Sequence, residues 1–128
     1  MSVEKIDTLV VGAGQAGIAL CGHLGQQGVP FLVLEKNRIA EAWRTSRWDA
    51  LVTNGPVWHD RFPNLEFKGN APDEFVSKDR VVDYIEEYAE LVNAPVRTGV
   101  EVLSAVPFAD RAGFRVETTD GVIEATRI

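Results

Sequence analysis

Two short apolar runs near the start of the chain are separated by a stretch with helical character. The pattern predicts a strand at residues 6–11, a helix at residues 14–27 and a second strand at residues 31–35. Gly28 and Pro30 follow the expected end of this helix, as is typical of a helix C-terminus. The second run has no alternation of apolar and polar positions, which indicates a strand covered on both faces in a parallel sheet.

A second helix is expected after Ser77, a good N-cap residue, and should end near residues 93–95. Its apolar residues recur at helical spacing, and acidic residues occupy most of the remaining positions. The rest of the chain has the pattern of short strands, with a tight turn at Asp120 and Gly121. We expect these strands to form an antiparallel meander at residues 95–106, 114–118 and 122–126.

Between these parts, residues 38–72 show no regular periodicity and contain Trp43, Trp48 and Trp58. A segment this long without regular structure inside a compact domain usually has a function. Disorder is the alternative, but disordered segments are poor in aromatic residues. We expect the tryptophans to pack beneath the loop rather than to stack on a bound ring, with Trp43 as the best exception.

Composition limits the functions open to the chain. Its 128 residues, of which 45% are hydrophobic and 25% are charged, are typical of one globular domain. The net charge of −6 disfavours nucleic acid as a partner. No apolar run approaches the ~20 residues of a membrane span, so we expect no membrane association. The single cysteine, Cys21, favours a cytoplasmic location, and the two histidines lack the spacing of a metal site.

The residues that link the first strand to its helix carry the strongest chemical signal. Gly12, Gly14 and Gly17 form a G-x-G-x-x-G pattern directly after the strand. We expect Gly12 to allow the sharp turn, Gly14 to let a diphosphate approach the backbone, and Gly17 to let helix and strand pack closely. Unpaired amide groups and a partial positive charge at the start of the helix would then stabilise the diphosphate.

Glu35 ends the second strand, 23 residues after Gly12. An acid at this distance accepts hydrogen bonds from ribose hydroxyls, and it repels a 2′-phosphate, which favours FAD or NAD over NADP. The neighbouring Lys36 and Arg38 keep NADP open. A glycine-rich turn without a ligand is the alternative, but strand, helix, second strand and acid occur here together. The sequence therefore predicts an α/β fold, a Rossmann-like three-layer FAD/NAD(P)-binding domain with a small antiparallel β-meander.

Four segments make the chain resemble the N-terminal, FAD-binding part of flavin-containing monooxygenases and related NAD(P)- and FAD-dependent oxidoreductases. The glycine loop with Glu35 and Lys36 is widely shared. The combination of the other three segments narrows the choice. These are AEAWR at residues 40–44, RWDALVTN at residues 47–54, and FVSK at residues 75–78 with the helix that follows. The resemblance implies that residues 1–128 form one FAD-binding domain.

The resemblance also assigns roles to single residues. Asn54 matches an asparagine beside the reactive edge of the flavin ring, where its amide would hydrogen-bond a peroxide. A turn before Gly55 and Pro56 is the alternative role for Asn54. Backbone groups near Val102 would contact the adenine, and Ala40 stands where the family has a glycine. The residues expected to hold the cofactor are Gly12, Gly14, Gln15, Ala16, Gly17, Glu35, Lys36, Trp43, Arg44 and Val102.

The activity implied by the resemblance is oxygenation of a small molecule by an NADPH-dependent monooxygenase through a flavin peroxide. Because the family continues into a second glycine-motif domain for NADPH, we expect an incomplete domain that is inactive alone. An incomplete sheet would leave an open edge, which predicts a homodimer or aggregation. The alternatives are a non-catalytic FAD- or NAD-binding module and a fragment of an NAD-dependent dehydrogenase.

Overall fold

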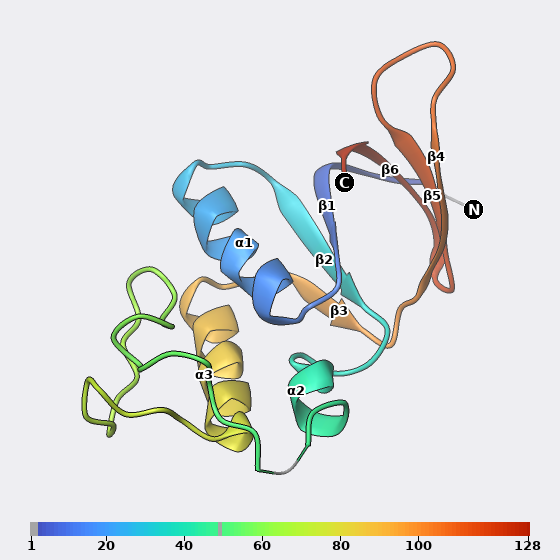
Figure 1. Ribbon diagram of the computed structural model, residues 1–128. Helices are drawn as coiled ribbons and strands as arrows, with labels where there is room; N and C mark the ends of the chain where they lie inside the picture. Colours follow the sequence, from blue (N-terminus) through green and yellow to red (C-terminus); the bar gives the residue numbers. More distant parts are fainter. Residues whose placement is uncertain (1–2, 49) are drawn as a thin grey trace.

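The computed structural model describes residues 3–48 and 50–128 (Figure 1). Asp49, which belongs to the 47–54 segment of the resemblance, lies outside the described residues. The helices and strands are, in chain order, β1 (Glu4–Val11), α1 (Gln15–Gln26), β2 (Phe31–Glu35), α2 (Glu41–Thr45), α3 (Lys78–Leu91), β3 (Val96–Thr98), β4 (Val102–Pro107), β5 (Phe114–Thr118) and β6 (Gly121–Arg127).

All the strands join one six-stranded sheet in the order β3-β2-β1-β6-β5-β4. The first four strands of this order are parallel, whereas β6, β5 and β4 pair antiparallel as a meander. Strand β6 belongs to both parts, because it pairs parallel to β1 through Thr8 and Arg127. The predicted α/β architecture with a small meander is confirmed, but the expectation that residues 95–106 all join the meander is wrong for β3, which pairs parallel to β2.

Helices α1 and α3 cover one face of the parallel strands (Figure 1). The core beneath them includes Ile18 of α1, Ile85 of α3 and Val33 of β2, all fully buried. Small residues on α1 allow the close approach. A side chain at Gly17 would collide with the carbonyl oxygen of Gly12, and one at Gly22 would collide with the hydroxyl of a tyrosine on α3. The expected close packing of helix on strand at Gly17 is therefore confirmed.

The opposite face of the parallel strands packs against the meander. Leu9 of β1 and Leu32 and Leu34 of β2 form a second buried cluster with Val116, Ile123 and Ala125 of β5 and β6. Strand β2 is thus covered on both faces, as its unbroken apolar run predicts. The helices, the parallel strands and the meander are the three layers of the fold.

The segment between β2 and α3 contains the short helix α2, which the sequence did not predict, and otherwise irregular backbone. The prediction that its tryptophans pack beneath the loop is wrong for Trp48 and Trp58, whose exposed fractions are 68% and 58%. Trp43 is half-buried against the helix-side core. Single-turn helices lack the repeated spacing that a periodicity signal needs, so α2 left no such signal.

None of the helices in the described residues has the length and apolar character needed to cross a membrane. The same residues contain no cluster of three metal-ligating side chains. Cys21 is buried in α1, and its thiol donates a hydrogen bond to the carbonyl oxygen of Gly17 at 3.1 Å. Burial raises the pKa of this thiol to about 11, so the side chain is a structural group rather than a reactive one.

Candidate functional site

The turn between β1 and α1 has the geometry that its glycines predict. Gly12 has a φ of +102°, in a region that L side chains rarely adopt, which confirms its role in the sharp turn. Its amide donates to the carbonyl oxygen of Leu34 at 2.8 Å. The turn is thereby fixed to the end of β2, beside Glu35.

Neither the backbone conformation of Gly14 nor its packing within the chain requires a glycine at this position. Its φ of −88° is open to any residue, and a Cβ built there would have no atom within 4 Å. It is also the N-cap of α1, a position where Ser, Thr, Asp or Asn would stabilise the helix, and it provides no side-chain cap. Bare backbone facing open space at a helix N-terminus matches a cradle for a diphosphate.

The first turn of α1 provides the donors for such a group. Within residues 3–48 and 50–128, the amides of Gly14, Gln15 and Ala16 have no hydrogen-bond acceptor in the protein. The helix that follows has 12 residues, long enough for a full dipole with partial positive charge at this end. The side chains of Gln15 and Ala16 are exposed, so what they offer a diphosphate is mainly their backbone.

The carboxylate of Glu35 lies at the centre of the site. One oxygen accepts from the amide of Ala13 at 2.8 Å, and the other accepts from the amide of Asn37 at 2.7 Å. A carboxylate has about four acceptor positions, so about two remain for ribose hydroxyls. The sequence did not predict the bond to Ala13, which links the tip of β2 to the glycine turn.

A cavity of about 250 Å³ opens at the carboxyl ends of β1 and β2. The amide of Val100 donates to the carbonyl oxygen of Glu35 at 3.1 Å, which draws the start of the meander to this edge. The predicted residues Gly12, Glu35, Lys36 and Val102 are thus brought together. The full lining is Val11, Gly12, Leu34, Glu35, Lys36, Val100, Glu101 and Val102.

A second, smaller cavity of about 90 Å³ lies where α1, α2 and α3 meet the long segment. Gln15, Trp43 and Asn54 line it, although they come from three distant parts of the sequence. Asn54 is exposed, and its amide has no partner within the described residues. Gln15, which follows the glycine turn in the sequence, belongs to the lining of this cavity.

The remaining predicted residues lie around this surface. Arg44 forms an ion pair with Glu86 of α3, and its Nε donates to the carbonyl oxygen of Ile39 at 3.2 Å. The arginine therefore ties α2 to α3, and only part of its guanidinium is left for a ligand. The guanidinium of Arg47 lies 4.9 Å from the centre of the Trp43 ring. Lys36 is exposed at the rim of the larger cavity.

Ala40, which stands where the family has a glycine, has a φ of +61° and is fully buried. Its amide donates to the carbonyl oxygen of Ala13 at 2.9 Å, so the start of α2 is held against the glycine turn. The left-handed conformation explains the family's glycine, because an alanine is strained by roughly 1–2 kcal/mol there.

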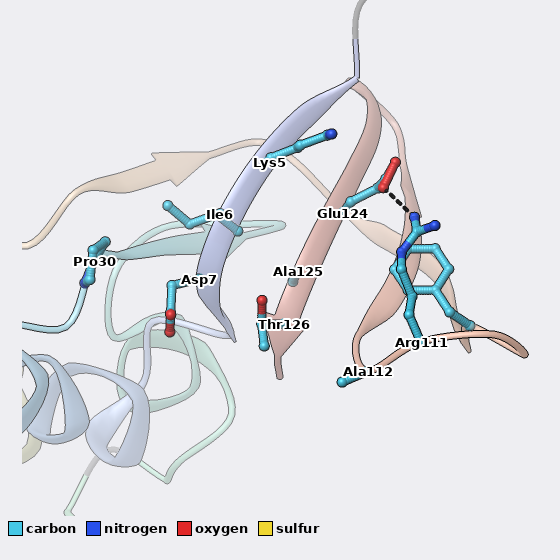
Figure 2. A pocket seen from close by; sticks show the side chains of 10 residues that line it. Lys5, Ile6, Asp7, Pro30, Arg111, Ala112, Glu124, Ala125 and Thr126 are labelled. Atoms are coloured by element: carbon cyan, nitrogen blue, oxygen red, sulfur yellow. Dashed lines mark hydrogen bonds and ion pairs between the residues drawn. The ribbon is translucent and has the colours of Figure 1, made fainter.

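Another cavity, of about 600 Å³, lies beside the amino-terminal half of β1 (Figure 2). Three of its charged groups are already paired, since Arg111 donates to Glu124 at 2.9 Å and Asp7 accepts from Arg127 at 2.8 Å. Arg111 also lies 3.9 Å from the centre of the Phe108 ring. None of the predicted site residues lines this cavity, so the glycine turn and not this hollow is the candidate site.

The sequence analysis missed two residues that shape the smaller cavity. Asp60 accepts a hydrogen bond from the amide of Gly55, and the hydroxyl of Tyr84 bonds to the backbone of Phe62 and Leu65. These contacts connect residues that local patterns do not relate. The Asn54-Gly55-Pro56 turn was the signal available for Asp60, since the buried amide of such a turn needs an acceptor.

Comparisons with known proteins give a consistent picture. The model of the family described as pyridine nucleotide-disulphide oxidoreductase matches residues 9–128. A CzcO-like oxidoreductase of Geobacillus kaustophilus is 36% identical over 124 residues, which cover 96% of this chain and 34% of that protein. The Arabidopsis thaliana protein named "Probable indole-3-pyruvate monooxygenase YUCCA9" is 34% identical over 113 residues, covering 87% of this chain and 26% of its own length.

Among solved structures, a flavin-containing monooxygenase from Stenotrophomonas maltophilia superposes with a TM-score of 0.81 at 22% identity. The match covers 97% of this chain and 37% of that one. The predicted resemblance to the FAD-binding part of flavin monooxygenases is therefore confirmed, and so is the Rossmann-like fold. The chain spans about a third or less of the length of the curated relatives it matches.

Proposed function

Because the chain belongs to the pyridine nucleotide-disulphide oxidoreductase family and has the fold of the FAD-binding domain of flavin monooxygenase-like oxidoreductases, we propose that it binds FAD. We further propose that it serves an NADPH-dependent monooxygenase that acts on a small molecule. The NADPH site belongs to other parts of such an enzyme. The sequence relative named as a monooxygenase supports oxygenation over other flavin chemistry.

One observation carries the proposal. Gly14 has an ordinary backbone conformation and open space around its missing side chain, at the N-cap of a helix with unpaired amides. Neither folding nor packing of this chain requires glycine there, whereas a bound diphosphate does. The donor set therefore fits FAD, whose pyrophosphate would lie on these amides and whose ribose would meet Glu35.

The chain's own residues would bind and orient the cofactor. The cavity beside Val102 takes the adenine, and the carboxylate of Glu35 accepts from the ribose hydroxyls. Asn54 offers one donor and one acceptor group beside the smaller cavity, where the half-buried Trp43 limits access of water. Bound FAD supplies the hydride and oxygen chemistry of the reaction.

A cytoplasmic location is part of the proposal. Cys21 is a free, buried thiol, and proteins of reducing compartments keep such thiols unpaired. The family description mentions disulphide chemistry, but this chain has one cysteine, and its thiol is buried with a raised pKa. Dithiol exchange would therefore need cysteines outside this chain.

Titration with FAD tests the proposal, using Gly14→Val and Gly25→Val as matched variants. Both glycines lie at α1, and a Cβ built at either one has no atom within 4 Å, so both variants should fold. We expect yellow protein with absorption near ~450 nm for wild type and Gly25→Val. Gly14→Val should bind FAD at least about tenfold more weakly, because its side chain fills the cradle.

Equal FAD affinity of Gly14→Val and Gly25→Val would contradict the assignment of the cradle. Glu35→Ala should also weaken binding by about tenfold, through loss of the ribose contacts and of the bond to Ala13. Binding of NADH in place of FAD would favour the dehydrogenase alternative. Oxidation of NADPH in air by the full-length parent enzyme would separate a monooxygenase from a non-catalytic module.

We also propose that the isolated chain associates with itself. Beyond Thr8, β1 pairs only with β2 among the described strands, and an apolar groove of about 700 Å³ follows this open edge. Val11 and Leu20 in the groove are 52% and 44% exposed. Open edges with apolar surface favour strand pairing between copies. A single monomeric species in light scattering would contradict this proposal.

A further inference from the structure

We propose that Asp60 is a positioning residue, which fixes Asn54 by holding the turn that follows it. The proposal rests on the proposed function, because Asn54 matters to the cofactor only if FAD is bound. Asp60 comes six positions after Asn54 in the sequence and lines the same cavity of about 90 Å³. It touches no part of the glycine cradle, so it would act through Asn54 and not on the cofactor.

The backbone before Asn54 is anchored to the strand-like segment at Val76. The amide of Thr53 donates to the carbonyl oxygen of Val76 at 2.9 Å, and the amide of Val76 donates to Oγ1 of Thr53 at 3.2 Å. Oγ1 of Thr53 also donates to the carbonyl oxygen of Gly55 at 2.7 Å. Two of these bonds tie the residue before Asn54 to Val76, and the third spans Asn54 from Thr53 to Gly55.

The backbone after Asn54 depends on Asp60. The amide of Gly55 donates to Oδ2 of Asp60 at 2.9 Å. A side chain at Gly55 would put its Cβ 2.7 Å from Oδ1 of Asp60, so the carboxylate can approach this closely because residue 55 is a glycine. A hydrogen bond to an ionised acceptor is roughly twice as strong as one between neutral groups. Thr53 and Asp60 thus hold the backbone on the two sides of Asn54, and we call this pair of contacts the clamp.

The clamp leaves the Asn54 side chain without a hydrogen-bond partner among the described residues. Its backbone is fixed on both sides, while its exposed amide has no acceptor or donor in the described chain. The Asp60 side chain is 26% exposed, and its other oxygen lies 2.7 Å from Nδ1 of His59, an exposed residue. A fixed backbone that carries a free polar group is the arrangement expected where a ligand is to be oriented.

Nuclear magnetic resonance on the ¹⁵N-labelled full chain tests the clamp without cofactor. In Asp60→Ala, the Gly55 amide should exchange with solvent about 10- to 100-fold faster, as loss of one hydrogen bond to a charged group implies. The resonances of the Asn54 side-chain amide should move as well. Asp60→Asn keeps an acceptor oxygen and should restore both signals. Asp110→Ala, in an exposed turn of the meander, is the matched control and should change neither.

The same variants, loaded with FAD, test whether the clamp affects the environment of the flavin ring. Asp60→Ala should bind FAD within about twofold of wild type, because the cradle is untouched. Its visible circular dichroism should change in the direction seen for Asn54→Ala, with recovery in Asp60→Asn. Should Asp60→Ala fail to fold, Asp60→Glu replaces it, since the longer side chain keeps the charge but moves the carboxylate away from Gly55.

An unchanged Gly55 amide in Asp60→Ala, or in Asp60→Glu where that variant replaces it, would overturn the proposal. A visible spectrum that responds to Asn54→Ala but not to Asp60→Ala would overturn it too. A wild-type chain that binds no FAD would instead contradict the proposed function. In that case the exchange of Gly55 and the Asn54 resonances still decide whether Asp60 holds the turn.

Discussion

The two halves of the candidate site are built in opposite ways. The cradle at the start of α1 lies between two regular elements, and its contacts run from main chain to main chain or to Glu35. The region around Asn54 has almost no regular structure between α2 and α3, and side chains of distant residues hold it. Tyr84 of α3 is the main anchor, because its hydroxyl accepts from Phe62 at 2.7 Å and donates to Leu65 at 2.5 Å.

The two halves are therefore expected to tolerate different substitutions. A main-chain cradle accepts most side chains except where a Cβ would enter the turn or the ligand. The Asn54 region instead depends on a few side chains, including Phe67, whose ring stacks on Tyr84 at 3.8 Å between centres. Substitutions at glycines should therefore damage the first half, and substitutions at polar side chains should damage the second.

The largest effect is expected at Gly17, where the first half is most closely packed. In Gly17→Ala the new Cβ collides with the carbonyl oxygen of Gly12, a backbone atom that cannot move without opening the turn. We expect a loss of about 3 kcal/mol in the free energy of unfolding. FAD affinity should fall with it, because Gly12 belongs to the cradle. Urea denaturation with and without FAD measures both.

Gly25→Ala is the control for this prediction. Gly25 is an exposed glycine of the same helix, with open space for a Cβ, so alanine should stabilise the protein by about 0.5–1 kcal/mol. If Gly17→Ala lowers the free energy of unfolding and Gly25→Ala raises it, the need for glycine at position 17 comes from its contact with Gly12. Equal effects at both positions would mean that helix propensity, and not packing, governs this helix.

A smaller effect, confined to the second half, is expected for Tyr84→Phe. The ring stays stacked on Phe67, but the buried amide of Phe62 and carbonyl oxygen of Leu65 lose their common partner. The cost should be about 2 kcal/mol in the free energy of unfolding. Amide exchange should increase in residues 53–76 and stay unchanged in α1. Tyr88→Phe is the matched control, because no hydrogen bond involves the Tyr88 hydroxyl within the described residues.

The sequence predicted the first half well because its rules are local. The glycine spacing fixed the turn, and an acid at the end of the second strand identified Glu35. The parallel character of the second strand and the meander followed from apolar runs and turns, whereas the place of β3 beside β2 did not. The second half could not be predicted from local patterns. The Tyr84 hydroxyl, for example, accepts from the amide of Phe62, which lies 22 residues away in the sequence. No periodicity links such partners, so tertiary contacts alone determine that region.

The exposure of Trp48 and Trp58 has the same origin. Aromatic side chains in a segment without periodicity suggest a buried loop, but burial depends on which residues α3 offers to that segment. The rings of Tyr84 and Tyr88 on α3 pack against the ring of Phe62, with centres 5.3 Å and 4.8 Å from that of Phe62, respectively. Phe67 fills the remaining place against Tyr84. The two tryptophans are left outside this cluster.

The smallest effect is expected at α2, which joins the two halves. The Arg38 guanidinium donates to both carboxylate oxygens of Glu41, at 2.8 and 3.0 Å, and with the Arg38 amide it lowers the pKa of Glu41 to about 2. Since the pKa of Glu41 in the folded chain lies below its ordinary value of 4.5, its contribution to stability is present above pH 4.5 and is lost as the pH falls towards 2.

Glu41→Gln tests this contribution by removing the charge at every pH. The melting temperature of the variant should lie slightly below that of wild type at pH 6, and the two should converge between pH 4.5 and pH 2. Tryptophan fluorescence is a suitable probe, because Trp43, one of the three tryptophans, lies on the same short helix. A difference that persists at pH 2 would mean that the Gln side chain disturbs α2 by packing. Convergence would show that the Arg38–Glu41 ion pair contributes to the acid sensitivity of the fold.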